Sequence, residues 1–194
     1  MNIVVFDLEW NQALDGRKPI EGLGGEIIQI GAAKIDLEGS ILSTFDRLIK
    51  PVVYKKMNRH VSELTLIKDQ DLEKGIGFKE AYEAFRSWLG DDTVLISWGP
   101  DDIRMLENNL LYFGFDSSWL PQTFDGQLMF DDMEKGEGRQ WPLNYALFYF
   151  EEKPNGAHNA LADVLSTVSV LKHLDLEDGL SDDYFRCDHF FGEE

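Results

Sequence analysis

Ile3-Val4-Val5-Phe6-Asp7-Leu8-Glu9 stands near the start of the chain, an apolar run that ends in two carboxylates two positions apart. The run predicts a buried strand, and alternate side chains of a strand share one face, so Asp7 and Glu9 point the same way. At a separation of about 4 Å and an effective dielectric of about 20, two like charges repel by about 4 kcal/mol. The pattern therefore indicates either a solvated strand end or a site that holds a positive group.

The segments that follow alternate between strand and helix patterns. A second strand over residues 27–35 and a third that runs to Ile49 are joined by the turn Asp36-Leu37-Glu38-Gly39, which predicts an antiparallel meander. Later segments predict a strand over 93–98 and a strand or extended piece over 123–130. They also predict short helical turns from Ser62, helices over 78–89, 101–113, 142–150 and 158–174, the last being the final helix, and an acidic loop over 131–138. Together they predict an α/β fold, a mixed sheet flanked by helices.

The length of 194 residues, 43% of them hydrophobic, allows one core and is too short for two ordinary domains. We expect one domain over residues 1–175. An acidic tail over residues 176–194 either packs onto it or binds a partner through its aromatic side chains, Tyr184, Phe185, Phe190 and Phe191. Since the chain has no membrane-helix run and no secretory pattern at its amino terminus, we expect a cytoplasmic protein. Its single Cys187 is expected to be an ordinary thiol.

The charge balance is strongly acidic, with 18 Lys and Arg against 36 Asp and Glu and a formal net charge of −18. Such a balance argues against an extended surface that grips duplex nucleic acid. Residues 47–60 form a basic stretch without an acid, with Arg47, Lys50, Lys55, Lys56 and Arg59. This stretch is either a solvated loop or a short track for the phosphates of one strand near an acidic site.

A third acid comes from Asp101-Asp102, which follow Ser97-Trp98-Gly99-Pro100 where a strand gives way to a helix. Ligand sites of open α/β sheets commonly lie at such junctions, although Asp in a first helical turn is also favoured by the helix dipole. Leu106 lies four residues after Asp102 and would point into the core from the same side. We therefore expect Asp102, rather than Asp101, to face a site.

A fourth element is His158-Asn159-Ala160-Leu161-Ala162-Asp163. Five helical positions amount to about 500°, so His158 and Asp163 would not share a face of one regular helix. They converge only if His158 lies in the lead-in to the helix, with Asn159 as its cap. Taken alone, each of the two is more often a solvated or satisfied residue than a catalyst.

In combination, these elements resemble the DEDDh class of 3'-to-5' exonucleases, the RNase T and DnaQ superfamily with a ribonuclease-H-like fold, over nearly the whole chain. Two further segments agree, Glu26-Ile27-Ile28-Gln29-Ile30-Gly31-Ala32 as the second strand and Ser62-Glu63-Leu64-Thr65 as the following helix. Ser97-Trp98-Gly99 before Asp102 is similar to the KapD-like branch.

The resemblance implies catalytic roles for five residues, Asp7, Glu9, Asp102, His158 and Asp163. The four carboxylates are hard oxygen ligands suited to two Mg2+ or Mn2+ ions. His158 would be the general base for water attack on the last phosphodiester, which releases nucleoside 5'-monophosphates one at a time, and the rate should rise above pH of about 6.5. The implied partners are 3' ends of single-stranded or short RNA or DNA; no membrane is implied.

Two positions depart from the pattern of that family. Trp10-Asn11 stands where many relatives have a small residue and threonine, and Asn159 follows His158 where arginine is frequent. Neither change touches the five catalytic residue types, but both affect how the terminal base and sugar are recognised. We expect Trp10 and Met105 to contact the substrate; Trp10 either stacks on a base or packs in the core.

Two other functions compete with the exonuclease. A ribonuclease-H-like endonuclease has its second acid on a helix well after the first strand, whereas here Asp7 and Glu9 are two residues apart. A binding or regulatory protein could keep the exonuclease fold without catalysis, and the intact set of five residues argues against that loss. The net charge favours short or single-stranded ends and does not choose between RNA and DNA.

Overall fold

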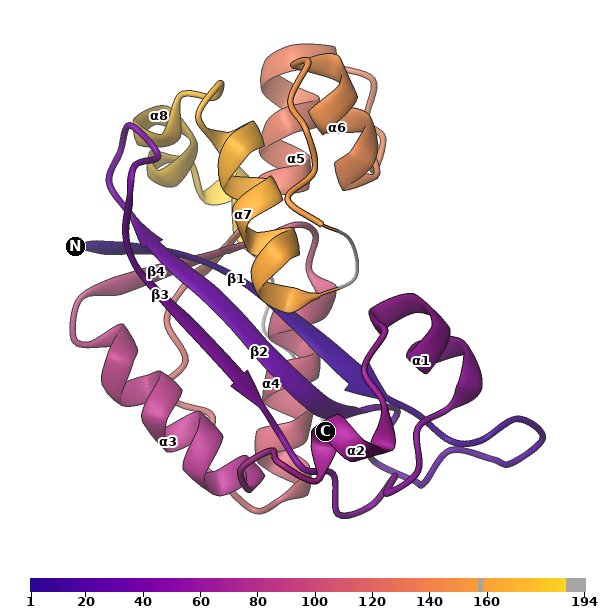
Figure 1. The fold of residues 1–194 in the computed structure, drawn as a ribbon. Coiled ribbons are helices and arrows are strands. Elements are labelled where there is room, and N and C mark those ends of the chain that lie inside the picture. The colour runs from indigo at the N-terminus through magenta and orange to yellow at the C-terminus, as the bar shows by residue number, and fades with distance from the viewer. Residues whose placement is uncertain (157–158, 188–194) are drawn as a thin grey trace.

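A five-stranded sheet in the order β3-β2-β1-β4-β5 forms the centre of the computed structural model, which describes residues 1–156 and 159–187 (Figure 1). An antiparallel meander comprises β1 (Asn2–Asn11), β2 (Glu26–Ile35) and β3 (Ile41–Leu48). β4 (Thr93–Ser97) runs parallel to β1, and β5 (Thr123–Asp125) runs parallel to β4. The predicted mixed sheet is therefore confirmed.

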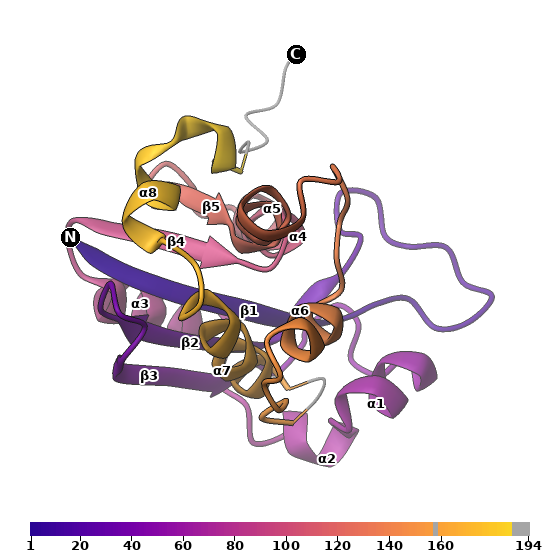
Figure 2. The ribbon, with the colours of Figure 1, turned by 90° about the horizontal axis from the view of Figure 1, so that it is seen from above.

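Helices cover both faces of this sheet (Figures 1 and 2). Alternate residues of β1 enter two different cores: Phe6 packs with α3 (Phe78–Leu89) and α4 (Asp101–Tyr112), and Val5 packs with α7 (Ala160–Leu171). The α7 face also carries α5 (Gly126–Phe130), α6 (Leu143–Tyr149) and α8 (Leu176–Ser181). The remaining elements are α1 (Arg59–Thr65), α2 (Asp69–Leu72), a π-helix (Asp131–Lys135) and a 3-10 turn (Asp183–Phe185).

The first strand is longer than its apolar run. β1 continues through both acids to Asn11, because β2 pairs with it as far as Glu26. Asp7 and Glu9 therefore lie within the strand, and the prediction that they end it is wrong. The helix predicted over residues 78–89 agrees with α3 in both bounds.

Two predicted elements are wrong between residues 123 and 138. The strand ends at Asp125, because one carboxylate oxygen of Asp125 accepts the backbone N–H groups of Gln127 and Leu128 and so starts α5. Much of the predicted acidic loop is the π-helix that continues from α5.

Two other helices, α1 and α7, begin at a different residue from the one predicted, because a capping side chain sets the start of each. α1 begins at Arg59, before the predicted Ser62, because the side chain of Asn58 accepts the N–H groups of His60 and Val61. α7 begins at Ala160 and ends at Leu171, with the side chain of Asn159 as its cap, as predicted. It is not the final helix, since α8 follows it.

Part of the predicted tail packs against the sheet. Leu176 and Phe185 are buried in the same core as Val5 of β1, whereas Tyr184 is exposed. Burial raises the pKa of the Cys187 thiol to about 12. Phe190 and Phe191 lie outside the described residues, and the boundary at residue 175 stays a prediction. None of the helices in the described part of the chain has the length and apolar character needed to cross a membrane.

Candidate active site and metal centre

The candidate site lies where β1 extends past the end of the neighbouring strand β4. Val5 pairs with Ile96, and β4 ends one residue later at Ser97, so the second half of β1 extends past the end of β4. The first turn of α4 lies there: the backbone N–H of Leu8 donates to a carboxylate oxygen of Asp102 at 3.0 Å. Asp102 thereby ties the start of α4 to the strand that carries Asp7 and Glu9.

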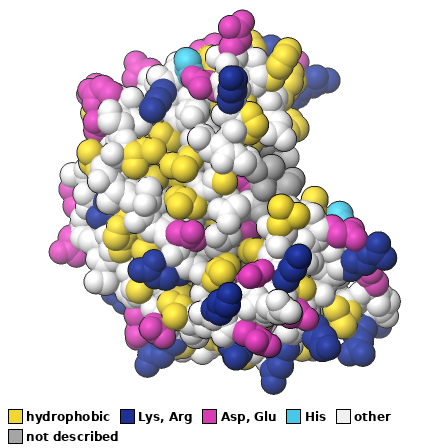
Figure 3. Space-filling model, viewed as in Figure 1, with side chains coloured by type: hydrophobic (Ala, Val, Ile, Leu, Met, Phe, Trp, Pro, Cys, Tyr) yellow, Lys and Arg dark blue, Asp and Glu magenta, His cyan; other side chains and the backbone are white. Residues whose placement is uncertain are grey.

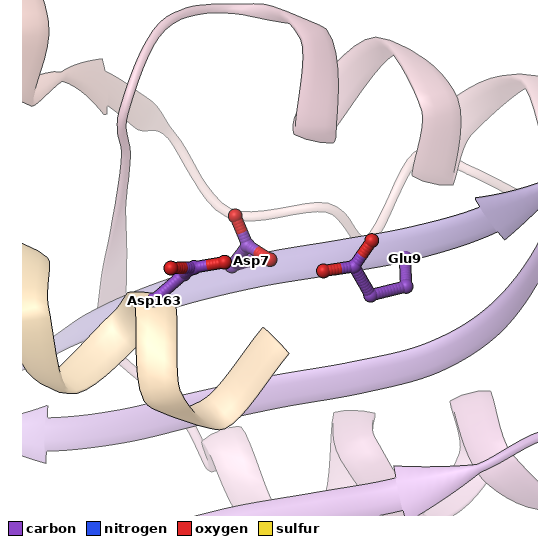
Figure 4. A group of neighbouring side chains, drawn as sticks. All are labelled: Asp7, Glu9 and Asp163. Carbon is purple, nitrogen blue, oxygen red and sulfur yellow. The ribbon is translucent and has the colours of Figure 1, made fainter. Parts of the chain in front are cut away.

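Asp7 and Glu9 face α7 and meet an acid from that helix. Figure 4 shows both side chains on β1 with the carboxylate of Asp163 turned toward them. One carboxylate oxygen from each of the three residues lies within 4.8 Å of the others, and all three side chains are half-buried. The prediction that Asp7 and Glu9 point the same way is confirmed, and the structure brings Asp163 to them.

Two residues of β2 dock the first turn of α7 beside these acids. Gly31 pairs with Asp7 across the sheet, and a Cβ added to Gly31 would collide with the backbone of Ala160 and Leu161. Gln29 pairs with Glu9, and its side-chain oxygen accepts the N–H of Ala160 at 3.2 Å. The absence of a side chain at Gly31 thus permits the close approach that sets Asp163 next to Asp7.

The acids raise one another's pKa values. The pKa of Asp7 lies well above its ordinary value because of burial first and then the charges of Asp102, Glu9 and Asp163. Burial, followed by the charges of Asp163 and Asp102, raises the pKa of Glu9 to about 8. Burial also raises the pKa of Asp102 to about 7, against the opposing effect of the Leu8 N–H. The ionised cluster is therefore costly without a cation.

The donor set fits a divalent cation. Within the described part of the chain, no hydrogen bond reaches the carboxylate of Asp7 or Glu9, so their oxygens are available to a ligand. Carboxylate oxygens are the ligands that Mg2+ and Mn2+ prefer. Asp7, Glu9 and Asp163 could hold such an ion directly, and Asp102 lies beside them, outside the 4.8 Å set.

The other predicted site residues have different positions. Asp102 is 7% exposed and Asp101 is exposed, so the choice between the two agrees with their burial. His158 lies outside the described residues. Trp10 and Met105 are both half-buried and pack against the α3 and α4 core beside Gly25. Core packing of Trp10 is confirmed, whereas substrate contact by either residue stays a prediction, as do the catalytic roles of the five.

Sequence reasoning missed the residues that position the site. Gln29 and Gly31 lie in a segment for which the sequence predicts only a strand, and Asn11 is a position where the sequence predicts an effect on substrate recognition. In the structure Asn11 is fully buried: its amide donates to the carbonyls of Tyr54 and Lys56, and its oxygen accepts the N–H of Asn58. A neutral polar residue directly after Trp10 in the strand is the available signal.

Comparisons with known proteins agree with this geometry. The model of the exonuclease family RNase_T matches residues 4–171. No curated protein shows significant similarity to the chain. The solved nuclease domain of 3'hExo, a DEDDh family member bound to rAMP, has a TM-score of 0.79 and 17% identity, covering 100% of this chain and 96% of that chain.

Two longer proteins share the fold. Cell-death related nuclease 4 (CRN-4) has a TM-score of 0.74 and 17% identity, over 89% of this chain and 62% of its own. E. coli Exonuclease I in complex with a dT13 oligonucleotide has a TM-score of 0.70 and 18% identity, over 94% and 43%. This chain therefore spans less than two thirds of the length of either.

The matched region includes both the strand with Asp7 and Glu9 and the helix with Asp163. Together with the sheet order, this confirms the ribonuclease-H-like fold and the resemblance to DEDDh exonucleases, while the finer likeness to the KapD-like branch stays a prediction. The chain belongs to the RNase_T exonuclease family.

Proposed function

We propose that this chain is a divalent-metal-dependent 3'-to-5' exonuclease, which removes nucleoside 5'-monophosphates from the 3' end of single-stranded or short RNA or DNA. The observation that carries the proposal is the convergence of Asp7, Glu9 and Asp163 within 4.8 Å in a family of exonucleases. Three like charges brought this close are retained in a fold only at a cost, and a bound cation offsets that cost.

Each acid has a distinct position in the proposed mechanism. Asp7, Glu9 and Asp163 hold the cations, and Asp102 fixes the edge of β1 through Leu8 while adding its own charge to the site. When bound, two Mg2+ or Mn2+ ions supply electrostatic stabilisation to the scissile phosphate and its leaving oxygen. His158 accepts the proton of the attacking water.

The class of substrate is supported by what similar structures contain. The 3'hExo nuclease domain was solved with rAMP, and E. coli Exonuclease I with dT13. One holds a ribonucleotide and the other a single-stranded DNA, so the fold accommodates both sugars. The net charge of −18 adds a preference for ends that need few phosphate contacts.

A 5'-labelled oligonucleotide with a free 3' hydroxyl tests direction and chemistry together. In Mn2+ we expect a ladder that shortens from the 3' end with release of nucleoside 5'-monophosphate, and no reaction in EDTA. A matched oligonucleotide with a blocked 3' end should stay intact. Internal cleavage of the blocked substrate would favour the endonuclease, and metal-induced thermal stabilisation without any hydrolysis would favour the regulatory protein.

Replacing His158 by Ala separates the general base from the metal site. The variant should lose most of its turnover while Mn2+ still raises its melting temperature, because the carboxylates are intact. Near-normal turnover of the variant would remove His158 from the mechanism. The rate of the intact protein should rise as pH passes above about 6.5, where an unperturbed imidazole becomes neutral.

A further inference from the structure

A basic groove lies just beyond the carboxyl end of β1. It is a hollow of about 360 Å³ between the loop that follows β1 and the loop around residues 53–56. Four exposed cations line it, Arg17, Lys18, Lys55 and Lys56, together with the half-buried apolar side chains of Ala13, Leu14 and Val53. We use the name basic groove for this set of residues.

The charge of the basic groove is opposite to that of the chain as a whole. The protein has twice as many acids as bases, yet no described Asp or Glu lines the groove. Within the described part of the chain, none of its four cations forms an ion pair, whereas nearby Arg59 is paired with Glu63 at 2.7 Å. Figure 3 shows Lys and Arg side chains gathered over the end of the molecule formed by α1, α2 and the loop between β1 and β2.

Buried hydrogen bonds fix the loop that carries Lys55 and Lys56. Asn11 and Glu26 pair across the ends of β1 and β2. The amide of Asn11 holds the carbonyls of Tyr54 and Lys56 at 2.8 and 2.9 Å. The carboxylate of Glu26, 2% exposed, accepts three consecutive backbone N–H groups, those of Val52, Val53 and Tyr54.

The opposite wall is tied to the same loop. The Tyr54 hydroxyl donates to the carbonyl of Leu23 at 2.7 Å and accepts the N–H of Ile20 at 2.9 Å. Both loops are thereby fastened to one another and to the catalytic strand. This anchoring fixes the backbone of the loop, while the side chains of Lys55 and Lys56 stay exposed to a ligand.

The basic groove continues the direction of the strand that holds the acids. Its first lining residue, Gln12, follows Glu9 by three positions, which corresponds to about 10 Å along an extended chain. A nucleic acid whose last phosphodiester lies at the acids can therefore reach the groove within a few nucleotides. The mixed lining suits this ligand, since cations attract phosphates and apolar side chains contact bases.

We propose that the basic groove binds the sugar-phosphate backbone of single-stranded nucleic acid on the 5' side of the scissile bond. The proposal rests on the exonuclease function proposed above and specifies how an acidic protein grips a polyanion. Lys55 and Lys56 supply the fixed positive charge, and Arg17 and Lys18 face them from the other loop. The groove thereby makes longer single strands better substrates than dinucleotides.

The test compares Lys55→Glu/Lys56→Glu with the matched control Lys74→Glu/Lys79→Glu, in which an exposed lysine after α2 and one in the first turn of α3 receive the same change of charge. Binding of a 5'-labelled oligouridylate dodecamer is measured by anisotropy in Ca2+, and kcat/KM is measured in Mn2+ for the dodecamer and for the dinucleotide UpU. Thermal melting checks that both variants fold.

For the groove variant we expect about tenfold weaker dodecamer binding and about tenfold lower kcat/KM, with a salt slope reduced by about 1.4 for two lost phosphate contacts. Its kcat/KM for UpU should stay within about twofold of that of the unmodified protein, and the control should match that protein throughout. The groove proposal would be overturned if the groove variant and the control variant lost dodecamer binding equally. It would also be overturned if the groove variant lost as much kcat/KM on UpU as on the dodecamer.

Binding without hydrolysis separates the two proposals. Suppose that the unmodified protein binds the dodecamer but hydrolyses neither substrate, and that the groove variant binds more weakly. The groove proposal is then supported and the exonuclease proposal is contradicted. If hydrolysis occurs and the groove variant binds like the unmodified protein, then the groove falls and the exonuclease function stands. Absence of both binding and hydrolysis overturns both.

Discussion

Neighbouring strands carry buried or half-buried carboxylates in two different environments, Glu26 on β2 and the pair Asp7 and Glu9 on β1. On β2, Glu26 is almost fully buried, and its oxygens accept the backbone N–H groups of three consecutive residues at 2.6 to 3.2 Å. On β1, Asp7 and Glu9 receive no hydrogen bond from the described residues and face the further acids Asp102 and Asp163. The same sheet thus satisfies one carboxylate internally and leaves the others for an external partner.

This difference separates a structural acid from a functional one without reference to any relative. A buried carboxylate that the backbone satisfies contributes to folding, because its removal leaves unpaired N–H groups. Acids that raise one another's pKa destabilise the metal-free fold where they are ionised, and a bound cation offsets that cost. The variants below test that distinction from each side.

The largest expected effect follows from Asp7→Asn. The substitution keeps the shape of the side chain and removes one charge from the cluster. We expect metal-dependent hydrolysis to fall by about three orders of magnitude, which corresponds to the several kcal/mol that metal catalysis supplies. At the same time the melting temperature in EDTA should rise, because repulsion is relieved. A variant that keeps full activity would remove Asp7 from the metal site.

Glu26→Ala should have the reverse profile. It leaves the N–H groups of Val52, Val53 and Tyr54 without their acceptor, at a cost of about 3 kcal/mol in the free energy of unfolding. For a chain of this length, that cost lowers the melting temperature by about 6 to 12 °C. Hydrolysis of UpU per folded molecule should be unchanged. Loss of UpU hydrolysis at unchanged stability would contradict the assignment of Glu26 as structural.

Gly31→Ala tests how the packing of α7 on β2 brings Asp163 to the acids of β1. The added methyl group meets the backbone of Ala160 and Leu161, so α7 must shift and Asp163 moves away from Asp7. Overpacking of this kind costs about 1 to 3 kcal/mol. We expect both the melting temperature and the Mn2+ affinity, measured by calorimetry, to fall. A less stable variant with unchanged Mn2+ affinity would show that Gly31 serves packing alone.

A gradual pH dependence of the metal-free protein is also expected. Folding raises the pKa of Glu9 to about 8 and that of Asp102 to about 7. At pH values between the ordinary pKa and the raised pKa of each group, the folded state therefore binds more protons than the unfolded state. Stability from these groups therefore falls as pH rises through this window, by up to about 1.4 kcal/mol per pH unit for each proton. Above pH of about 8 the loss is complete.

Thermal melts in EDTA between pH 5 and pH 9 measure this dependence, with Glu9→Gln as the control. Glu9→Gln should flatten the decline, and Mn2+ should do the same for the unmodified protein because it binds the ionised acids. A decline that is identical in Glu9→Gln would show that other groups cause it.

The sequence predicts the strands and helices better than it predicts the contacts between them that place the candidate acids side by side. Asp102 was distinguished from Asp101 because a core-facing Leu106 follows at helical spacing, and the cap of α7 was found because Asn159 precedes an apolar helix. Both are local signals. The close packing of α7 on Gly31 joins residues about 130 positions apart, and no local pattern reports such a contact.

Errors at other places have equally physical causes. Residues 126–130 are apolar enough for a strand, but the cap at Asp125 starts a helix. The first strand was cut short because charged residues end most strand patterns, whereas pairing with β2 carries β1 past both acids. The structure thus brings Asp7, Glu9 and Asp163 together, but the prediction that Asp7 and Glu9 end the strand is wrong.

The most direct test of the account is calorimetric titration of the metal-free protein with Mn2+ at pH 8, with Asp7→Asn and Glu26→Gln compared under the same conditions. We expect saturable Mn2+ binding by the unmodified protein and by Glu26→Gln, and its loss in Asp7→Asn, because Asp7 belongs to the proposed metal centre and Glu26 does not. Equal Mn2+ binding by all three proteins, or none by the unmodified protein, would contradict the claim that Asp7, Glu9 and Asp163 form a metal centre.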